Sequence, residues 1–178
     1  SLLGQLAVDD IADILVTLPQ AGVALVTEPE VEKRAPRTDY EAKFSLQYST
    51  AAMLVHGQVG VKSYTTAAIA DPKVLAVAAK VRYEVKPYPT YPGSFPGGVV
   101  ITLKDGRKLV AELDYQKGGP ENPLSADEVL EKWRGNASLC LEDAVVEQLE
   151  RTMLGIEEHA DLRAAFAPLA SARAGAAV

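Results

Sequence analysis

The chain has 178 residues, of which 48% are hydrophobic and 24% charged, a composition typical of a globular protein with its own core. A net charge of −6 disfavours binding to nucleic-acid phosphates, and no stretch approaches the roughly 20 apolar residues that span a bilayer. One cysteine and two histidines rule out an intramolecular disulfide and disfavour a thiolate or histidine-rich metal centre. We therefore expect a soluble, cytoplasmic protein without a metal, a nucleic-acid partner or a membrane partner.

The first third of the chain is predicted to contain a strand, a loop and a long helix. Apolar, β-branched residues predict a strand at 14–18, which Pro19 ends. Two prolines among several charges make 28–38 a predicted surface loop. Apolar residues at 3.6-residue spacing predict one helix over 40–55, and Gly57 suits the left-handed conformation that ends a helix. We expect one stripe of this helix to be buried: Phe44, Tyr48, Ala51, Ala52 and Val55.

The middle of the chain is predicted to form a helix, a strand and a hairpin. Asp71 is a good helix N-cap, and the proline after it suits the first helical position. Residues 81–85 read as a strand, and 86–98 as a loop dense in proline, glycine and aromatics. We interpret this loop as a rigid connection whose rings cover the sheet, with a binding groove as the alternative. Alternating apolar residues around an Asp-Gly turn predict a β-hairpin over 99–113.

The last third is predicted to be helical. Ser125 and Glu128 form a capping box, and a further amphipathic helix is expected over 142–157. Because strands and helices mix without regular βαβ alternation, we predict the α+β class. The expected architecture is a two-layer α/β sandwich with a small antiparallel sheet in 9–117. A C-terminal helical segment, 118–178, follows it.

Several short motifs occur in a characteristic order along the chain. After a first extended segment come EAKFSLQYSTAAML at 41–54, VITLKDG at 100–106, PENPLS at 120–125 and KWRGNAS at 132–138. Together they resemble the C-terminal half of the MmgE/PrpD family over roughly residues 8–157. That family includes 2-methylcitrate dehydratases, cis-aconitate decarboxylases and an iminodisuccinate epimerase.

The resemblance implies a parent enzyme with two domains, a large helical one and a smaller α+β lid, with the catalytic cleft between them. Residues 9–117 would be the lid, and 118–178 would be helices that return to the large domain. The large N-terminal helical domain would then be missing from this chain. The resemblance also implies a homodimer, a small di- or tricarboxylate substrate, and neither a metal nor an organic cofactor.

The resemblance carries over one catalytic residue, Tyr48, which matches a cleft-facing tyrosine of the family motif. Lys43 and Ser45 lie on the same motif and are assigned as substrate-binding. Phe44 occupies a position that is often histidine in relatives, so the sequence departs from the family there. From periodicity alone, Tyr48 is a core tyrosine, Lys43 a solvated charge and Ser45 a surface hydroxyl.

We therefore hypothesise that the chain is the lid portion of a cofactor-independent lyase or isomerase that is 2-methylcitrate dehydratase-like. The isolated chain is expected to be inactive. The alternative is a free-standing, non-catalytic α+β module for binding or assembly, or one subunit of a split enzyme. The two readings differ in what the surface facing a missing domain would do. In the first it would complete an active site, and in the second it would bind a partner.

Overall fold

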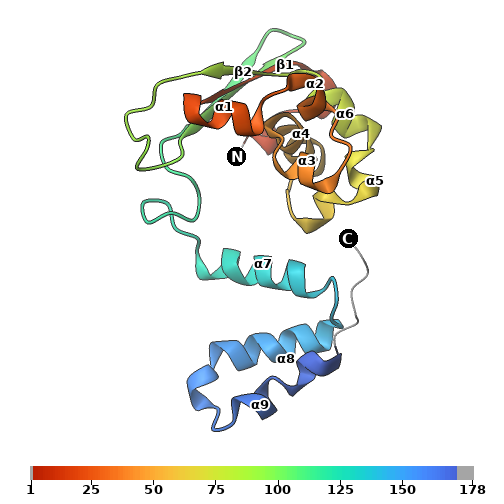
Figure 1. Ribbon diagram of the computed structural model, residues 1–178, viewed down its shortest axis with the longest axis vertical. Helices are drawn as coiled ribbons and strands as arrows, with labels where there is room; N and C mark the ends of the chain where they lie inside the picture. Colours follow the sequence, from red (N-terminus) through yellow and green to blue (C-terminus); the bar gives the residue numbers. More distant parts are fainter. Residues whose placement is uncertain (1, 172–178) are drawn as a thin grey trace. The chain divides into compact units, whose positions relative to one another are not determined.

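The computed structural model describes residues 2–171 and divides the chain into two separately packed units, Ser1–Asn122 and Pro123–Val178 (Figure 1). The first unit contains the whole β-sheet, and the second is helical. No helix among the described residues is long and apolar enough to cross a membrane.

The sheet of the first unit has four strands in the order β2-β1-β3-β4. β1 pairs with β2 in parallel, whereas β1–β3 and β3–β4 are antiparallel. The α+β prediction is confirmed, but the sheet is mixed rather than antiparallel. The reason is the long helical connection between β1 and β2, which returns the chain to the end of the sheet where β1 began. The strand bounds are β1 Ile11–Leu18, β2 Val81–Val85, β3 Gly97–Leu103 and β4 Lys108–Leu113.

Six α-helices of the first unit follow β1 in the chain and precede β2: α1 Gln20–Val26, α2 Glu30–Arg34, α3 Asp39–Lys43, α4 Leu46–His56, α5 Thr66–Ile69 and α6 Pro72–Ala78. Short 3-10 turns lie at Leu3–Gln5, Val8–Asp10 and Val61–Tyr64. The segment predicted as a loop over 28–38 contains α2, because Pro29 precedes a run of good helix formers that begins at Glu30. Asp71 caps α6 as predicted, since its side chain accepts from the Lys73 N–H.

The helix predicted over 40–55 is in fact two helices, α3 and α4. Ser45 has an extended backbone, and its hydroxyl accepts a hydrogen bond from the Tyr48 N–H at 2.9 Å. Ser45 is therefore the N-cap of α4. The predicted buried stripe is confirmed at Tyr48, Ala51 and Ala52, whereas Phe44 is only partly buried because it lies in the break. Val55 is also partly buried.

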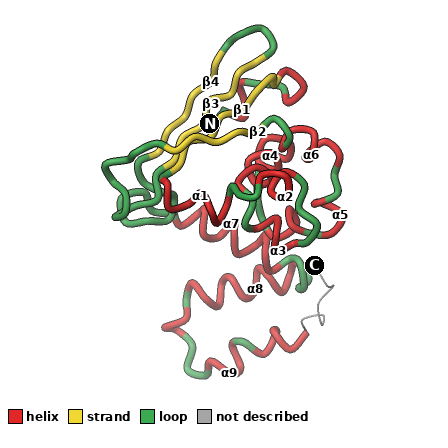
Figure 2. The backbone as a smooth tube through the Cα atoms, turned by 45° about the horizontal axis from the view of Figure 1, so that its top comes forward, coloured by secondary structure: helices red, strands yellow, loops and turns green. Residues whose placement is uncertain are grey.

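The helices of the first unit lie on one side of the sheet (Figure 2). Alternate residues of each strand point to that side and form the inner face, which packs on α4 and α6 in a single core. Its most deeply buried members include Ile14, Val81, Ile101, Tyr48 and Val74. The opposite, outer face carries more polar side chains, and Val110 on it is 61% exposed.

The loop between β2 and β3 places Tyr88 against the outer face. Tyr88 is 6% exposed, and its hydroxyl lies 2.7 Å from the Thr17 hydroxyl on β1. A side chain at Gly98 would meet that Thr17 oxygen at 2.6 Å, so only glycine lets the ring approach so closely. The prediction that aromatic rings of this loop cover the sheet holds for Tyr88 but not for Phe95, which is 72% exposed.

The second unit contains α7 Ala126–Ala137, α8 Asp143–Leu154 and α9 Leu162–Ala165, with 3-10 turns at Ile156–Glu158 and Ala167–Ser171. The capping box predicted at Ser125 and Glu128 is present at the start of α7. The helix predicted over 142–157 is α8, which ends at Leu154 because Gly155 follows it. Val146 and Leu149 are the buried apolar residues of α8.

An ion pair between α7 and α8 makes the second unit sensitive to acid. The Arg134 guanidinium donates to both Glu150 oxygens, at 2.7 and 2.5 Å, and these bonds lower the pKa of Glu150 from its ordinary 4.5. A lowered pKa means that the stabilisation is full above pH 4.5 and is lost as the pH falls through the lower folded-state value.

We therefore expect Glu150→Gln to lower the urea midpoint at pH 7 but to change it little at pH 2. Fluorescence of Trp133 on α7, the only tryptophan, reports this transition. The matched control is Glu147→Gln, because Glu147 lies 3.8 Å from Arg151 and both side chains are more than 70% exposed, at 72% and 71%. Equal midpoint losses for the two variants at pH 7 would contradict the prediction.

Candidate functional site

An open groove of about 750 Å³ lies in the first unit between the inner face of the sheet and α4. Most of its lining is apolar: Leu2, Leu3, Val16, Val26, Leu46, Met53, Leu54, Val59, Val99, Ile101, Ala111 and Leu113. Its polar lining consists of Lys43, Ser45, Ser49 and Thr50, which come from the α3–α4 break and the first turns of α4. Two of the three predicted site residues therefore line this groove.

Lys43 is the groove's cationic group. It is the last residue of α3, and its ammonium lies 2.8 Å from an Asp39 carboxylate oxygen one turn earlier. Their side chains are 51% and 56% exposed, and the hydrogen bond from Lys43 lowers the pKa of Asp39. An exposed pair of this kind is weak, so the ammonium can exchange Asp39 for another carboxylate.

Ser45 is 2% exposed, and its hydroxyl is fully engaged within the protein. It donates to the Lys33 carbonyl in a short hydrogen bond and accepts from the Tyr48 N–H. The hydroxyl thus caps α4 and ties it to α2. Binding a ligand through this oxygen would require one of these bonds to be exchanged.

Tyr48 lies behind the groove wall and is 0% exposed. Its hydroxyl donates to the Ser63 carbonyl at 2.6 Å, and its ring packs on Tyr64 with centroids 6.0 Å apart. Burial raises the pKa of Tyr48, which keeps the phenol protonated near neutral pH. The geometry is that of a core tyrosine holding the 3-10 turn that follows α4, and its catalytic role stays a prediction.

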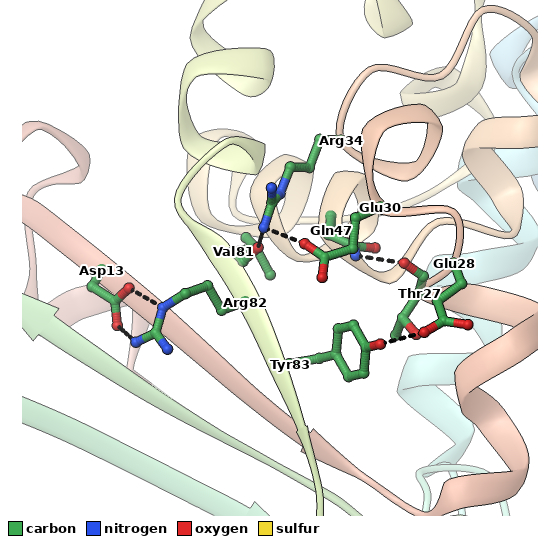
Figure 3. A network of polar contacts seen from close by, with 9 residues as sticks. All are labelled: Asp13, Thr27, Glu28, Glu30, Arg34, Gln47, Val81, Arg82 and Tyr83. Carbon is green, nitrogen blue, oxygen red and sulfur yellow. Dashed lines mark hydrogen bonds and ion pairs between the residues drawn. The ribbon is translucent and has the colours of Figure 1, made fainter.

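A polar network around α2 holds α1, α2 and α4 against each other and against β2 (Figure 3). Arg34 pairs with Glu30 at 2.5 Å and donates to the Val81 carbonyl of β2 at 3.3 Å. The Gln47 amide on α4 donates to the Thr27 carbonyl at 3.0 Å. These contacts connect α1, α2 and α4 with the sheet, and they place the short helix α2 beside the α3–α4 break.

Lys33 is the residue that sequence reasoning missed. Its ammonium donates to the Leu25 carbonyl at 2.7 Å and to the Phe44 carbonyl at 2.6 Å. Together with the bond from Ser45 to the Lys33 carbonyl, it fixes the break where Lys43 and Ser45 enter the groove. No local pattern marks Lys33, because it lies in a segment that looks like a charged loop.

Within the described residues, no group of three or more His, Cys, Asp or Glu side chains is placed to hold a metal ion. The single cysteine, Cys140, lies in the second unit and contacts the Ala137 carbonyl. The described lining of the groove is mostly apolar, with the Lys43 ammonium at its polar end.

Residues 3–157 match the family model described as the MmgE/PrpD C-terminal domain. The chain belongs to the MmgE/PrpD family. Human cis-aconitate decarboxylase is 33% identical to this MmgE/PrpD domain over 137 residues, which cover 74% of the chain and 27% of the human protein. The mouse enzyme of that name is 32% identical over 134 residues, and cis-aconitate decarboxylase-like protein oryM of Aspergillus oryzae is 27% identical over 128.

These matches confirm the resemblance inferred from the ordered motifs. The MmgE/PrpD chain spans only about a quarter of the length of these relatives, since the shared regions amount to 27%, 27% and 26% of the three proteins. The relatives are named as decarboxylases, which are lyases, and the family is therefore lyase-like.

Proposed function

We propose that this chain is the lid portion of a cofactor-independent lyase or isomerase that acts on small di- or tricarboxylates. The observation that supports this proposal is the family match over residues 3–157, together with relatives named cis-aconitate decarboxylases. The proposal gives the first unit the role of one wall of a catalytic cleft. The second wall would come from a large helical domain outside this chain.

The residues that line the groove support a cleft that is shared between two domains. A di- or tricarboxylate carries two or three negative charges, and each needs a cation or a hydrogen-bond donor when water is excluded. Among the described residues, Lys43 is the only basic one that lines the groove, beside three hydroxyl-bearing residues and a mostly apolar surface. One ammonium is too little for such a substrate, so further cationic groups would be supplied by the other domain.

The proposed roles of Lys43 and Ser45 follow from their contacts, whereas that of Tyr48 follows from the family resemblance. Lys43 would exchange Asp39 for a substrate carboxylate. The resemblance gives Tyr48 a place in the cleft, where it would act as a proton donor; its hydroxyl, which donates to the Ser63 carbonyl behind the groove wall, would first have to turn toward the substrate. Ser45 would position the start of α4, and it would contact substrate only if its bond to Lys33 opened.

Tyr48→Phe tests both the proposal and the role of the hydroxyl. The experiment assays the full-length protein with cis-aconitate, 2-methylcitrate and citrate. We expect kcat to fall at least about tenfold on the accepted substrate with little change in KM, as for removal of a general acid. Unfolding free energy should fall by about 1 kcal/mol, because the Ser63 carbonyl loses its donor.

The matched control for this experiment is Tyr64→Phe. It removes the neighbouring phenol, which lies 3.1 Å from the Ser49 hydroxyl, and it should leave kcat near the parent value. Unchanged turnover in Tyr48→Phe would remove Tyr48 from the mechanism. If the unsubstituted full-length protein turned over no di- or tricarboxylate, the proposed function itself would be contradicted.

The binding or assembly module remains the second candidate, and the apolar groove is the observation that favours it. Under the lid proposal, the purified 178-residue chain should bind these carboxylates weakly and turn none of them over. Turnover by the isolated chain would contradict the claim that a second domain completes the site.

A further inference from the structure

Two faces of α4 carry apolar side chains, and they differ in how far they are covered. Tyr48, Ala51 and Ala52 form the face that is buried in the core. The second face lines the groove, and its residues follow the spacing of one helical stripe: Leu46, Ser49, Thr50, Met53 and Leu54. None of these five side chains is fully buried, and Met53 is 40% exposed. The second stripe therefore faces a space that is open to an apolar ligand.

The groove is polar at one end of α4 and apolar at the other. Lys43 and Ser45 lie just before the helix, and the stripe ends in Met53 and Leu54. The sheet forms the opposite wall, with apolar residues from β1, β3 and β4: Val16, Val99, Ile101, Ala111 and Leu113. Among the described residues that line the groove, Lys43 alone is basic and none is acidic. A complementary ligand has one anionic head and an apolar tail.

We propose that this groove binds a medium-chain fatty acid, with the carboxylate on the Lys43 ammonium and the alkyl chain between α4 and the sheet. A volume of about 750 Å³ falls within the roughly 300–1,000 Å³ of small-molecule sites. Lys43 is available to the carboxylate because its pairing with Asp39 is exposed, with the two side chains 51% and 56% accessible. Binding needs only the first unit, so it stands apart from the proposed lyase activity.

The distribution of charge in the groove favours one carboxylate over two or three. A second carboxylate would lie against the apolar walls, where a charge loses its hydration without gaining a partner. An alkyl chain in the same place removes apolar surface from water, and each methylene that is fully buried tightens binding about fourfold. A cationic head would meet the Lys43 ammonium and no acidic residue of the described lining. The groove therefore selects both the sign and the number of charges.

Calorimetric titration of the purified chain with decanoate tests the binding. We expect one site with a Kd of about 10 μM to 1 mM, because an open groove covers only part of the alkyl chain. Affinity should rise about two- to fourfold for each methylene added between octanoate and decanoate. Acetate has the head without the tail, and decyltrimethylammonium has the opposite charge, so both should bind at least about tenfold more weakly. Citrate should also bind more weakly than decanoate, despite its three carboxylates.

Two substitutions at the ion pair should move the affinity in opposite directions. Lys43→Gln removes the ammonium and should raise the decanoate Kd about three- to tenfold. Asp39→Asn removes the competing carboxylate and should lower the Kd about twofold, since the ammonium no longer has to leave Asp39. Lys73→Gln removes an exposed ammonium on α6, outside the groove lining, and is the matched control that should leave the Kd unchanged.

The two methionines of the chain locate the ligand. Met53 lines the groove, whereas Met153 lies on α8 in the second unit, and the two residues are similarly exposed, at 40% and 48%. In an NMR spectrum of the chain labelled at the methionine methyl groups, decanoate should shift the Met53 signal along the calorimetric binding curve. The Met153 signal should stay in place, because its surroundings belong to another unit.

Three results would overturn the proposal. They are equal shifts of the two methionine signals, a decanoate Kd that Lys43→Gln leaves unchanged, and no saturable binding up to about 5 mM decanoate. Equal shifts would mean that decanoate associates with any exposed apolar surface. None of these results bears on turnover of a di- or tricarboxylate by the full-length protein, so the two proposals fail separately.

Discussion

Ile14→Ala should lower the unfolding free energy of the first unit by about 2–5 kcal/mol, the range for truncating a fully buried isoleucine. Ile14 is 0% exposed at the centre of the sheet, where it pairs with Val81 on one side and Ile101 on the other. Its side chain lies on the inner face beneath α4 and α6. Backbone pairing on both sides limits collapse of the site, so the cavity should persist and the cost should lie in the upper part of this range.

The chain contains two separate optical probes for this measurement. All seven tyrosines lie in the first unit and the one tryptophan, Trp133, lies in the second. Urea unfolding followed by tyrosine absorbance should show the full loss in Ile14→Ala at an unchanged m value. The control is Leu25→Ala, whose side chain is 58% exposed on α1 and whose loss should cost less than about 1 kcal/mol. Similar losses for the two variants would show that Ile14 is not at the centre of the core.

The features that could be predicted from the sequence are those that depend on a few neighbouring residues. Gly57 adopts a positive φ of 76° at the end of α4, Asp71 caps α6, and Ser125 forms its capping box with Glu128. In each case a few consecutive residues supply both the donor and the acceptor, or one residue type alone tolerates the backbone conformation. The hairpin turn between β3 and β4 follows the same logic.

Features that depend on residues far apart in the chain could not be predicted from the sequence. The parallel pairing of β1 and β2 is decided by where the intervening segment 19–80, with its six α-helices, returns the chain, not by either strand's composition. The α3–α4 break depends on Lys33, which is twelve residues before Ser45 in sequence. For the site, the motif pointed to Lys43 and Ser45, which do line the groove. It could not reveal that Tyr48 lies behind the groove wall.

Lys33→Met should lower the unfolding free energy of the first unit by about 2–4 kcal/mol. Hydrogen bonds that involve a charged group contribute about 1.5–3 kcal/mol each, and this ammonium donates to two carbonyls, those of Leu25 and Phe44. Methionine keeps most of the apolar stem, and water can reach the Leu25 carbonyl, so the loss should stay below the sum of two full bonds. Lys73→Met on α6, where the side chain is exposed, is the matched control.

A double-mutant cycle with Ser45→Ala shows whether Lys33 and Ser45 act as one unit. Ser45→Ala alone removes the α4 cap and the bond to the Lys33 carbonyl, at a cost of about 1–2 kcal/mol. If both residues hold the same break, the double variant should lose less than the sum, with a coupling of about 0.5–3 kcal/mol. Because the break presents Lys43 to the groove, this coupling also measures how firmly the polar end of the site is held. Additive losses would mean that the cap and the ammonium stabilise the chain independently.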